Sequence, residues 1–514
     1  MRKILLLISI LSLLASIACR RANTEYVTLA LPEAFTTFDT LTTEKSDAAA
    51  ERLKNLMFSG LVKKTETFDY VGDLASEIKT SEDGKAITFV LRDNVKFHNG
   101  AAFTSKDVKY TFDELFKAKG YKSFAFFDTV NKQPVAHLTS IETPDDKTVI
   151  FNLRSASIRN QLLANLVAIP IVAEGTAGQL KTQPIGSGAF KFVSFDASQN
   201  IVELAAFSDY WEGAPKVAKL RVKTVTDASA LQAELQTGGV DIAAVPSNLP
   251  PDAIKILDGV ANLKVEQFDG SNIQYLGFNT QDEILKNSKI RQAIGYAIDR
   301  EKIIRELLSG QAKAATSILP ATSWAYTPGT VYAFDPAKSK QLIQEAGYNR
   351  QPIRFKYASG NAAFNSMVQA IQSSLLEVGL NVEILPVDPN TLRQEVAQGQ
   401  YQMNTGIWIG GNQDPIFLRD LFTKAKIPGE GVSCCNRWRY SNEEVDKLLE
   451  AAFNEPDRAK AKELYTNAWN IISAENPLYP LWYPANMVIY NKRIGNIKLN
   501  ASGDWSFAKD ITVQ

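Results

Sequence analysis

The sequence predicts an α/β fold, because stretches with helical periodicity alternate with short apolar stretches typical of strands. A helix over residues 227–239 is followed at once by a strand over 240–242, and a helix over 335–347 is followed by a strand over 353–357. Such alternation is typical of an open α/β sheet. The chain has 514 residues, 45% of them hydrophobic, with no internal repeat or low-complexity linker. We therefore expect one interwoven protein with large cores.

Charge and histidine content argue against several functions. Lys plus Arg and Asp plus Glu both number 56, so nothing in the charge favours nucleic acid or a polybasic membrane contact. The two histidines, His98 and His137, belong to no His-Glu-x-x-His motif, and the chain has no Gly-x-Ser-x-Gly motif or zinc-ligand cluster. We expect no enzyme, cofactor or metal site. A secreted hydrolase, the alternative, would need a carboxylate or lysine as its general base.

The N-terminus reads as an export signal over residues 1–19. Arg2 and Lys3 precede an apolar run over 4–14, and small residues lead to Cys19. This run is short for a membrane span and lacks stop-transfer flanks. The ending Ser-Ile-Ala-Cys resembles a bacterial lipobox, which implies lipidation at Cys19. Plain secretion and an uncleaved anchor are the alternatives, and we expect no later membrane span.

Two adjacent cysteines, Cys434 and Cys435, remain. Three states of these cysteines are compatible with the sequence: a strained vicinal disulfide, no pairing, or metal binding. Two neighbouring thiols do not complete a tetrahedral zinc site by themselves. A local constraint on the loop is the interpretation we favour. We interpret His98, which lies beside a turn, as a packed or hydrogen-bonded residue and not as a metal ligand.

The first elements follow from local patterns. A strand over 26–31 alternates apolar and polar residues and ends at Pro32. The loop over 33–39 is rich in aromatic and hydroxyl side chains, and a helix is expected over 48–61. An ordinary strand-to-helix connection is the simplest interpretation of that loop.

A denser pattern follows in residues 83–108. It predicts a turn at 83–84, a strand over 87–91, a turn at 99–100 and a helix capped by Thr104 with Asp107 three residues later. Further on, residues 185–192 form a glycine turn that enters a strand. This turn is not a phosphate loop, because the Gly-Lys-Ser/Thr ending and the following helix are missing.

The stretch 275–300 is central to the prediction. It begins with a strand over 275–279 and continues with a helix whose apolar residues recur at helical spacing over 290–298. Asp299 and Arg300 are expected to close that helix on its solvated side.

The C-terminal part continues the alternation. Strands are predicted over 382–384 and 402–408, and the second of them runs into a loop over 409–415. Ser441 and Glu444 have the spacing of a capping box. The aromatic stretch 479–483 is predicted to return the chain to its first half.

These motifs resemble one known family. The passages 83–108 and 275–300 resemble the signatures of the peptide/nickel family of bacterial extracellular solute-binding proteins (family 5), and the resemblance extends from Tyr26 to about Phe507. It implies a two-lobed periplasmic-binding-protein fold of type II, in the large cluster with an extra subdomain, and a hinge of two crossovers. The implied division is a signal at 1–19, the core of lobe I at 24–52, 183–270 and 484–514, its extra subdomain at 53–182, and lobe II at 271–483.

The resemblance also implies a function. The chain would be the substrate-binding receptor of an ABC-type importer for peptides. It would act as a monomer on the periplasmic side of the cell envelope, attached through its lipid, and deliver ligand to permease subunits. Closure of the two lobes around a ligand would favour the closed state. A nickel or metal-chelate receptor is disfavoured by the shortage of histidines.

The implied binding site departs from the family pattern. Family members hold the ligand ammonium with an aspartate in the loop 408–415, where this chain has Gly411, and Asp414 matches a residue that is usually structural. Dipeptide binders carry an arginine in the loop corresponding to 359–365, which has none here. A longer or blocked peptide, an oligosaccharide or another solute therefore fits better than a short free peptide. The candidate ligand-binding residues are Phe35, Thr37, Phe38, Asn279, Ser359, Gly360, Asn361, Trp408, Gly411, Asn412 and Asp414.

Overall fold

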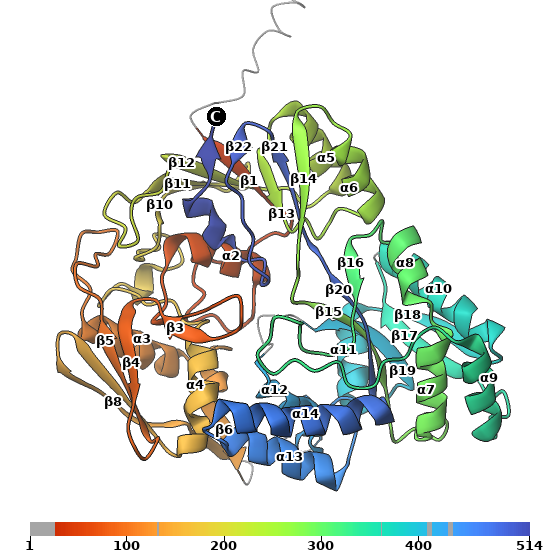
Figure 1. The fold of residues 1–514 in the computed structure, drawn as a ribbon. Coiled ribbons are helices and arrows are strands. Elements are labelled where there is room, and N and C mark those ends of the chain that lie inside the picture. The colour runs from red at the N-terminus through yellow and green to blue at the C-terminus, as the bar shows by residue number, and fades with distance from the viewer. Residues whose placement is uncertain (1–25, 131–132, 361, 409–413, 430–434) are drawn as a thin grey trace, which may run out of the picture.

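The computed structural model describes residues 26–130, 133–360, 362–408, 414–429 and 435–514. Within these residues the chain forms two large sheets, a smaller four-stranded sheet, and helices around them (Figure 1). Predictions made for Cys19, Asn361, Gly411, Asn412 and Cys434 lie outside the described residues.

The seven-stranded sheet contains the first strand at its centre. Strand β1 is hydrogen-bonded to parallel neighbours on both sides, and all five of its residues are buried. The alternation in its sequence therefore does not separate a buried face from a solvated one. The strand order is β10 (Phe190–Asp196), β11 (Ile201–Ala206), β12 (Lys219–Thr224), β1 (Val27–Leu31), β13 (Ile242–Ala244), β21 (Asn486–Asn491) and β14 (Leu263–Phe268).

Helices cover this sheet, and a smaller unit is inserted after the first of them. Helices α2 (Ala48–Met57), α5 (Ala228–Thr237) and α6 (Pro251–Asp258) pack near the sheet. The inserted unit holds two hairpins and a four-stranded sheet with two helices. Its elements are β2 (Val62–Lys64), β3 (Tyr70–Gly72), β4 (Ala75–Thr80), β5 (Ala86–Leu91), α3 (Ser105–Ala118), β6 (Phe127–Val130), β7 (Gln133–Ala136), β8 (Leu138–Asp145), β9 (Thr148–Leu153) and α4 (Arg159–Leu166).

The six-stranded sheet forms the second lobe with its own helices. Its strand order is β16 (Ala312–Ala314), β20 (Leu478–Pro484), β15 (Ile273–Phe278), β19 (Met403–Trp408), β17 (Ile353–Ala358) and β18 (Val382–Val387). The helices are α7 (Ser288–Ala297), α8 (Arg300–Glu306), α9 (Pro336–Glu345), α10 (Ala362–Glu377), α11 (Pro389–Gln398), α12 (Phe417–Phe422), α13 (Glu443–Asn454) and α14 (Arg458–Glu475).

Two crossovers join the sheets. The chain leaves the seven-stranded sheet after β14, enters the six-stranded sheet at β15, and returns between β20 and β21 at Ala485. We call residues 26–268 and 486–514 the first lobe and residues 273–484 the second lobe. The predicted two-lobed α/β fold with two crossovers is confirmed.

Local signals predicted several boundaries well. Asp335 caps α9 by accepting a hydrogen bond from the Lys338 N–H, with proline in the first turn. The Thr104 N–H donates to the Asp107 carboxylate at 2.8 Å, as a capping box requires. The helix predicted over 48–61 ends earlier, at Met57.

The glycine turn before β10 has a steric reason. A Cβ atom on Gly186 would lie 2.1 Å from the carbonyl oxygen of Met57, and one on Gly188 would lie 2.4 Å from the Met57 carbonyl carbon. Only glycine permits this approach of the turn to the end of α2. The turn is therefore a packing feature, as its lack of a phosphate-loop ending suggested.

Two predicted details are wrong. Arg300 is not on a solvated side: it is 9% exposed, begins α8 after the N-cap Asp299, and its Nη1 donates to backbone carbonyls of Ala315 and Pro480. The cap of α13 is Asn442, whose side chain accepts hydrogen bonds from two N–H groups, and not Ser441. Asn442 directly precedes the first helical residue, and its Oδ1 lies 3.0 and 3.2 Å from the N–H groups of Glu444 and Val445.

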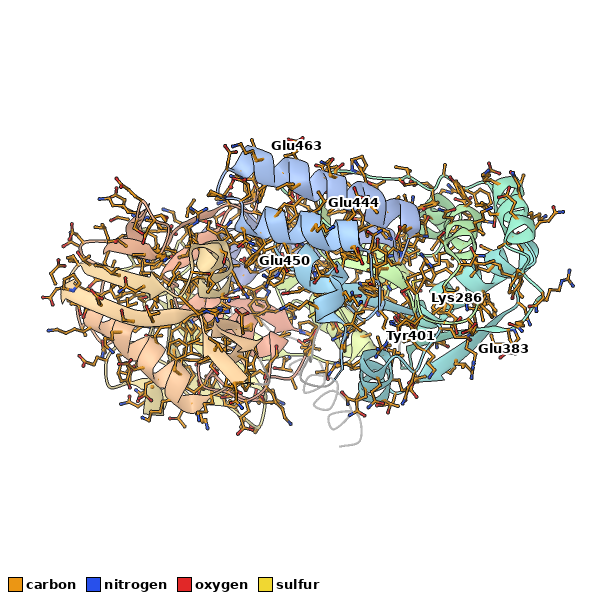
Figure 2. All side chains as sticks on the ribbon, turned by 90° about the horizontal axis from the view of Figure 1, so that it is seen from below. Lys286, Glu383, Tyr401, Glu444, Glu450 and Glu463 are labelled. Carbon is orange, nitrogen blue, oxygen red and sulfur yellow. The ribbon has the colours of Figure 1, made fainter. Side chains whose placement is uncertain are left out.

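Helices α13 and α14 form an outer layer of the second lobe. Figure 2 shows them side by side, with the exposed Glu444 and Glu463 on this layer. Among the described residues, no helix is long and apolar enough to cross a membrane. Nor does any group of three or more His, Cys, Asp and Glu side chains in this part of the chain have the arrangement of a metal site.

Candidate functional site

The β2–β3 hairpin of the first lobe contacts the second lobe. The Tyr70 hydroxyl, in β3, donates a hydrogen bond of 2.6 Å to Oδ2 of Asp414, which lies 344 residues further along the chain. Asp69, at the tip of the hairpin, forms an ion pair with Arg458 at the start of α14. The lobes are therefore joined by direct side-chain contacts as well as by the two crossovers.

The Asp414 carboxylate lies at the centre of this contact and is only 3% exposed. Its Oδ1 accepts a hydrogen bond of 3.0 Å from the Ile416 N–H. Burial raises the pKa of Asp414, whereas the Tyr70 hydroxyl, the Ile416 N–H and the charges of Lys64 and Arg458 oppose that shift. Both carboxylate oxygens thus have protein partners when the lobes are together.

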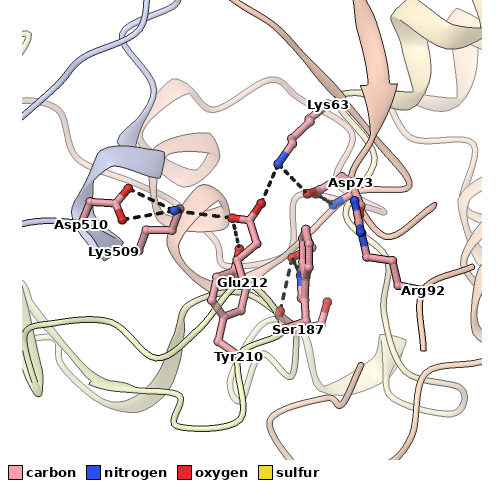
Figure 3. Close-up of polar contacts among 11 residues, drawn as sticks. Lys63, Asp73, Arg92, Ser187, Tyr210, Glu212, Lys509 and Asp510 are labelled. Atoms are coloured by element: carbon pink, nitrogen blue, oxygen red, sulfur yellow. Dashed lines mark hydrogen bonds and ion pairs between the residues drawn. The ribbon is translucent and has the colours of Figure 1, made fainter. Parts of the chain in front are cut away.

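A polar network at the base of the hairpin holds it on the first lobe (Figure 3). Lys63, in β2, pairs with Glu212 at 2.7 Å, and Glu212 also pairs with Lys509 near the C-terminus at 3.6 Å. Arg92 donates from Nε to the backbone carbonyl of Asp73 at 2.6 Å. The hairpin is thus fixed at its base to three separate segments of the first lobe, and its tip reaches the second lobe.

Asp73 makes the stability of this base depend on pH. Burial raises its pKa to about 6, and Lys63 is the strongest opposing charge. Because this folded value lies above the unfolded value of about 3.9, the stability that the protonated carboxyl contributes is present below pH 4 and is lost as pH rises through 6.

We therefore expect Asp73→Asn to raise the free energy of unfolding by about 1 to 3 kcal/mol at pH 7.5 and to have little effect at pH 4. The amide is nearly the same size and keeps an acceptor for the Gly60 N–H, which now donates to Oδ2 at 2.9 Å. Chemical denaturation at both pH values measures the difference. A variant that is destabilised equally at both values would contradict the expectation.

Trp408 ends strand β19 and lies next to this contact. It is partly buried against the core of the second lobe. A small pocket there is lined by Trp408, Asp414, Ile318, Leu319, Phe417, Leu418 and Leu421. The structure therefore brings together two of the predicted site residues, Trp408 and Asp414, although it gives Asp414 a partner that the sequence did not reveal.

The predicted residues of the first-lobe loop lie in an aromatic cluster. Phe38 is 5% exposed, and its ring centroid lies 4.9 Å from Phe35 and 5.2 Å from Phe192. The Thr37 hydroxyl accepts a hydrogen bond of 3.0 Å from the Asp39 N–H. Phe38 thus packs in the core of the first lobe, and Phe35 is the more accessible ring.

The predicted second-lobe residues have different surroundings. Asn279 is 7% exposed, and its amide donates to the backbone carbonyls of Gly399 and Tyr401 at 3.1 and 3.0 Å. These bonds use both donors of the amide, so we leave Asn279 out of the proposed ligand contacts. Ser359 and Gly360 are exposed at the end of β17.

The sequence did not predict the hairpin residues Asp69 and Tyr70 or their partner Arg458. No periodicity or motif marks them, because their contacts join segments that are distant in the chain. The one sequence signal is the loop 408–415 itself, which pointed to Asp414.

The histidine and cysteine predictions have different outcomes. His98 is packed and hydrogen-bonded as predicted: its Nδ1 accepts from the Gly186 N–H at 3.3 Å, and its ring lies 5.0 Å from that of Phe207. Burial lowers the pKa of His98 to about 4. Cys435 is disulfide-bonded, and Cys434, its partner in the predicted vicinal pair, lies outside the described residues.

A comparison with protein families decides what this two-lobed arrangement is. The model of the bacterial extracellular solute-binding proteins, family 5, matches residues 69–429. The chain belongs to this family. Tyr70 and Asp414, the two residues of the contact between the lobes, both lie inside the region that matches family 5.

Two similar proteins align along most of the chain. The peptide transport periplasmic protein SapA of Salmonella typhimurium is 26% identical over 469 residues, which cover 86% of this chain and 84% of SapA. The oligopeptide-binding protein AppA of Bacillus subtilis is 26% identical over 486 residues, 89% of this chain and 86% of AppA.

Solved structures support the fold. AppA of Bacillus subtilis in complex with a nonapeptide superposes with a TM-score of 0.73 at 24% identity, covering 95% of this chain and 98% of that one. NikA of Brucella suis in complex with Fe(III)-EDTA superposes with a TM-score of 0.82 at 20% identity, covering 95% of this chain and all of that one. The family 5 fold is therefore the same in proteins with very different ligands.

Proposed function

We propose that this protein is the peptide receptor of an ABC-type importer and that it holds its ligand between the two lobes. The observation that carries the proposal is the buried Tyr70–Asp414 contact, which joins the two lobes in addition to the two short crossovers. Such a connection permits hinge motion, and contacts made only in the closed form set the closed population.

Peptides are the ligand class that we favour. SapA and AppA are named for peptide transport and oligopeptide binding. The ligand backbone would add as a strand beside protein segments, which gives affinity with little side-chain preference. Because Asp414 already has protein donors on both oxygens, we propose that it does not bind the ligand ammonium.

Native mass spectrometry of residues 20–514, purified gently from cells, tests the ligand class. A peptide receptor with little sequence preference releases a ladder of peptide masses on denaturation. A single defined non-peptide mass would show that peptide is the wrong class and leave a receptor for another solute.

Trp408→Ala is expected to weaken ligand binding at least tenfold, about 1.4 kcal/mol, because it removes an aromatic wall next to Asp414. Titration calorimetry with the solute recovered from the wild-type protein measures this loss. Ile407→Ala is the matched control, since that neighbouring side chain is 47% exposed. Equal affinities for wild type and Trp408→Ala would show that Trp408 does not contact the ligand.

We also propose that a lipid on Cys19 holds the protein at the outer face of the membrane. Cys19→Ala is then expected to move most of the protein from the membrane fraction to the soluble fraction, because a signal without the lipidated cysteine leaves no acyl chain. Ser16→Ala, which keeps the cysteine, is the control. Membrane association of both variants would count against the lipid.

A further inference from the structure

The central strands of the first lobe end together at one edge of the seven-stranded sheet. Strands β12, β1 and β13 are parallel neighbours, so their carboxyl ends lie on the same side. In open α/β sheets, ligands bind in the crevice outside the carboxyl ends of the strands. The segments that leave this edge are 32–47 after β1, 225–227 after β12 and 245–250 after β13.

Two side chains connect these segments. The Ser247 hydroxyl donates a hydrogen bond of 2.9 Å to Oε1 of Glu33. Asn248 donates from Nδ2 to the carbonyls of Val225 and Thr226 at 3.0 and 3.1 Å. The loops after all three strands are therefore tied into one surface.

Polar atoms without protein partners occur around this edge. Nη1 of Arg52, in helix α2, is buried and has no hydrogen-bond partner among the described residues, and the same holds for Oδ1 of Asn248. Burial lowers the pKa of Arg52, and the charge of Glu33 opposes that shift. Buried polar groups in folded proteins are nearly always hydrogen-bonded, and a guanidinium is costly to leave unpaired.

Glu33 does not pair with the Arg52 guanidinium. Arg52 and Glu33 influence each other electrostatically, but the two described side chains form no ion pair within 4 Å, and Glu33 instead accepts from Ser247. The guanidinium fork matches a carboxylate in shape and charge. A carboxylate supplied by a bound solute is the partner that would satisfy it.

We propose that Arg52 holds a carboxylate of the bound peptide at the carboxyl edge of the first-lobe sheet, with Asn248 Oδ1 as an acceptor for a peptide N–H beside it. This inference rests on the proposed peptide function. It places the selection of a free carboxyl terminus in the first lobe, and the arginine expected in the loop 359–365 of dipeptide binders is then not needed.

Competition between two peptide mixtures tests the proposal. The detergent-solubilised full chain is incubated with equal amounts of a random peptide mixture of three to eight residues and its C-terminal amide counterpart. The protein is re-isolated, and the bound forms are quantified by mass. The wild type is expected to recover the carboxylate form at least tenfold over the amide.

Variants assign this selection to Arg52. Arg52→Gln and Arg52→Ala are expected to recover both forms about equally, and Arg52→Lys to give an intermediate ratio because ammonium lacks the planar fork. Lys45→Ala, which removes a positive charge from an exposed residue of the segment that leads into α2, is expected to keep the wild-type ratio.

The outcomes separate the two proposals. Equal recovery by the wild type, or selection that persists in Arg52→Gln, overturns the carboxylate site and leaves the peptide function standing. Recovery of neither mixture by the wild type overturns the peptide function, and the Arg52 site falls with it.

Discussion

Tyr70→Phe is expected to weaken ligand affinity by about 10- to 100-fold. The lost hydroxyl donates to the buried Asp414 carboxylate at 2.6 Å, and a hydrogen bond to a charged group contributes about 1.5 to 3 kcal/mol. Because that bond joins the two lobes, its loss destabilises the closed form and leaves each lobe intact. A ligand that binds only the closed form then binds more weakly by the same factor as the population of the closed form falls.

Calorimetry with the solute recovered from the wild type measures the change. Tyr348→Phe is the control, since it removes the same atom from a tyrosine whose hydroxyl donates within the second lobe, to the carbonyl of Gln351. If Tyr70→Phe binds ligand as tightly as wild type but unfolds at a lower temperature, the hydrogen bond stabilises the fold and does not control closure of the lobes.

The ion pair at the hairpin tip contributes less to closure of the lobes than the hydrogen bond between Tyr70 and Asp414 does. The side chains of Arg458 and Asp69 are 52% and 34% exposed, and exposed pairs are worth about 0 to 1 kcal/mol. The closure energy of this contact therefore comes mainly from Tyr70 and Asp414. Raised salt is expected to weaken the tip pair and to leave the buried hydrogen bond in place.

Arg300→Ala is expected to lower the free energy of unfolding by about 3 kcal/mol. Nη1 of Arg300 donates to carbonyls of Ala315, just after β16, and of Pro480 in β20, and its guanidinium lies 5.1 Å from the ring of Tyr479. Removing the donor leaves these buried carbonyls unsatisfied, at about 1 to 3 kcal/mol each. Strand β20 also carries the chain into the second crossover, so the loss should loosen the hinge.

Urea denaturation followed by tryptophan fluorescence measures this loss. Arg305→Ala is the matched control, because that side chain belongs to the same helix α8 and is 67% exposed. We expect less than about 0.5 kcal/mol for the control. An Arg300→Ala protein as stable as the control would mean that water replaces the guanidinium at these carbonyls.

Features that depend on near neighbours in the chain were predictable. The caps of α3 and α9 follow from a polar side chain that bonds to an N–H group three residues away, and the strand predicted over 402–408 agrees with β19. The α13 cap was assigned one residue too early, because Ser441 and Asn442 both suit that position. Only the observed hydrogen bonds distinguish them.

The binding site was predictable only in part. The family motifs pointed to the loops that carry Trp408 and Asp414, and the structure brings these two residues together. Phe38 was chosen from a loop and Asn279 from the end of a predicted strand, yet both are buried. Sequence patterns place a residue on a loop, but they do not determine whether its side chain faces a ligand or the core.

The sequence by itself determined the α/β class, the family and several element boundaries, because these depend on periodicity, caps and motifs within a few residues. Only the tertiary structure decided that Arg300 is buried beneath the returning strand, and that Tyr70 reaches Asp414 across 344 residues of chain. It also decided that Arg52 carries a buried nitrogen with no hydrogen-bond partner among the described residues. Such facts depend on which distant surfaces meet when the sheets pack, and no local pattern encodes that.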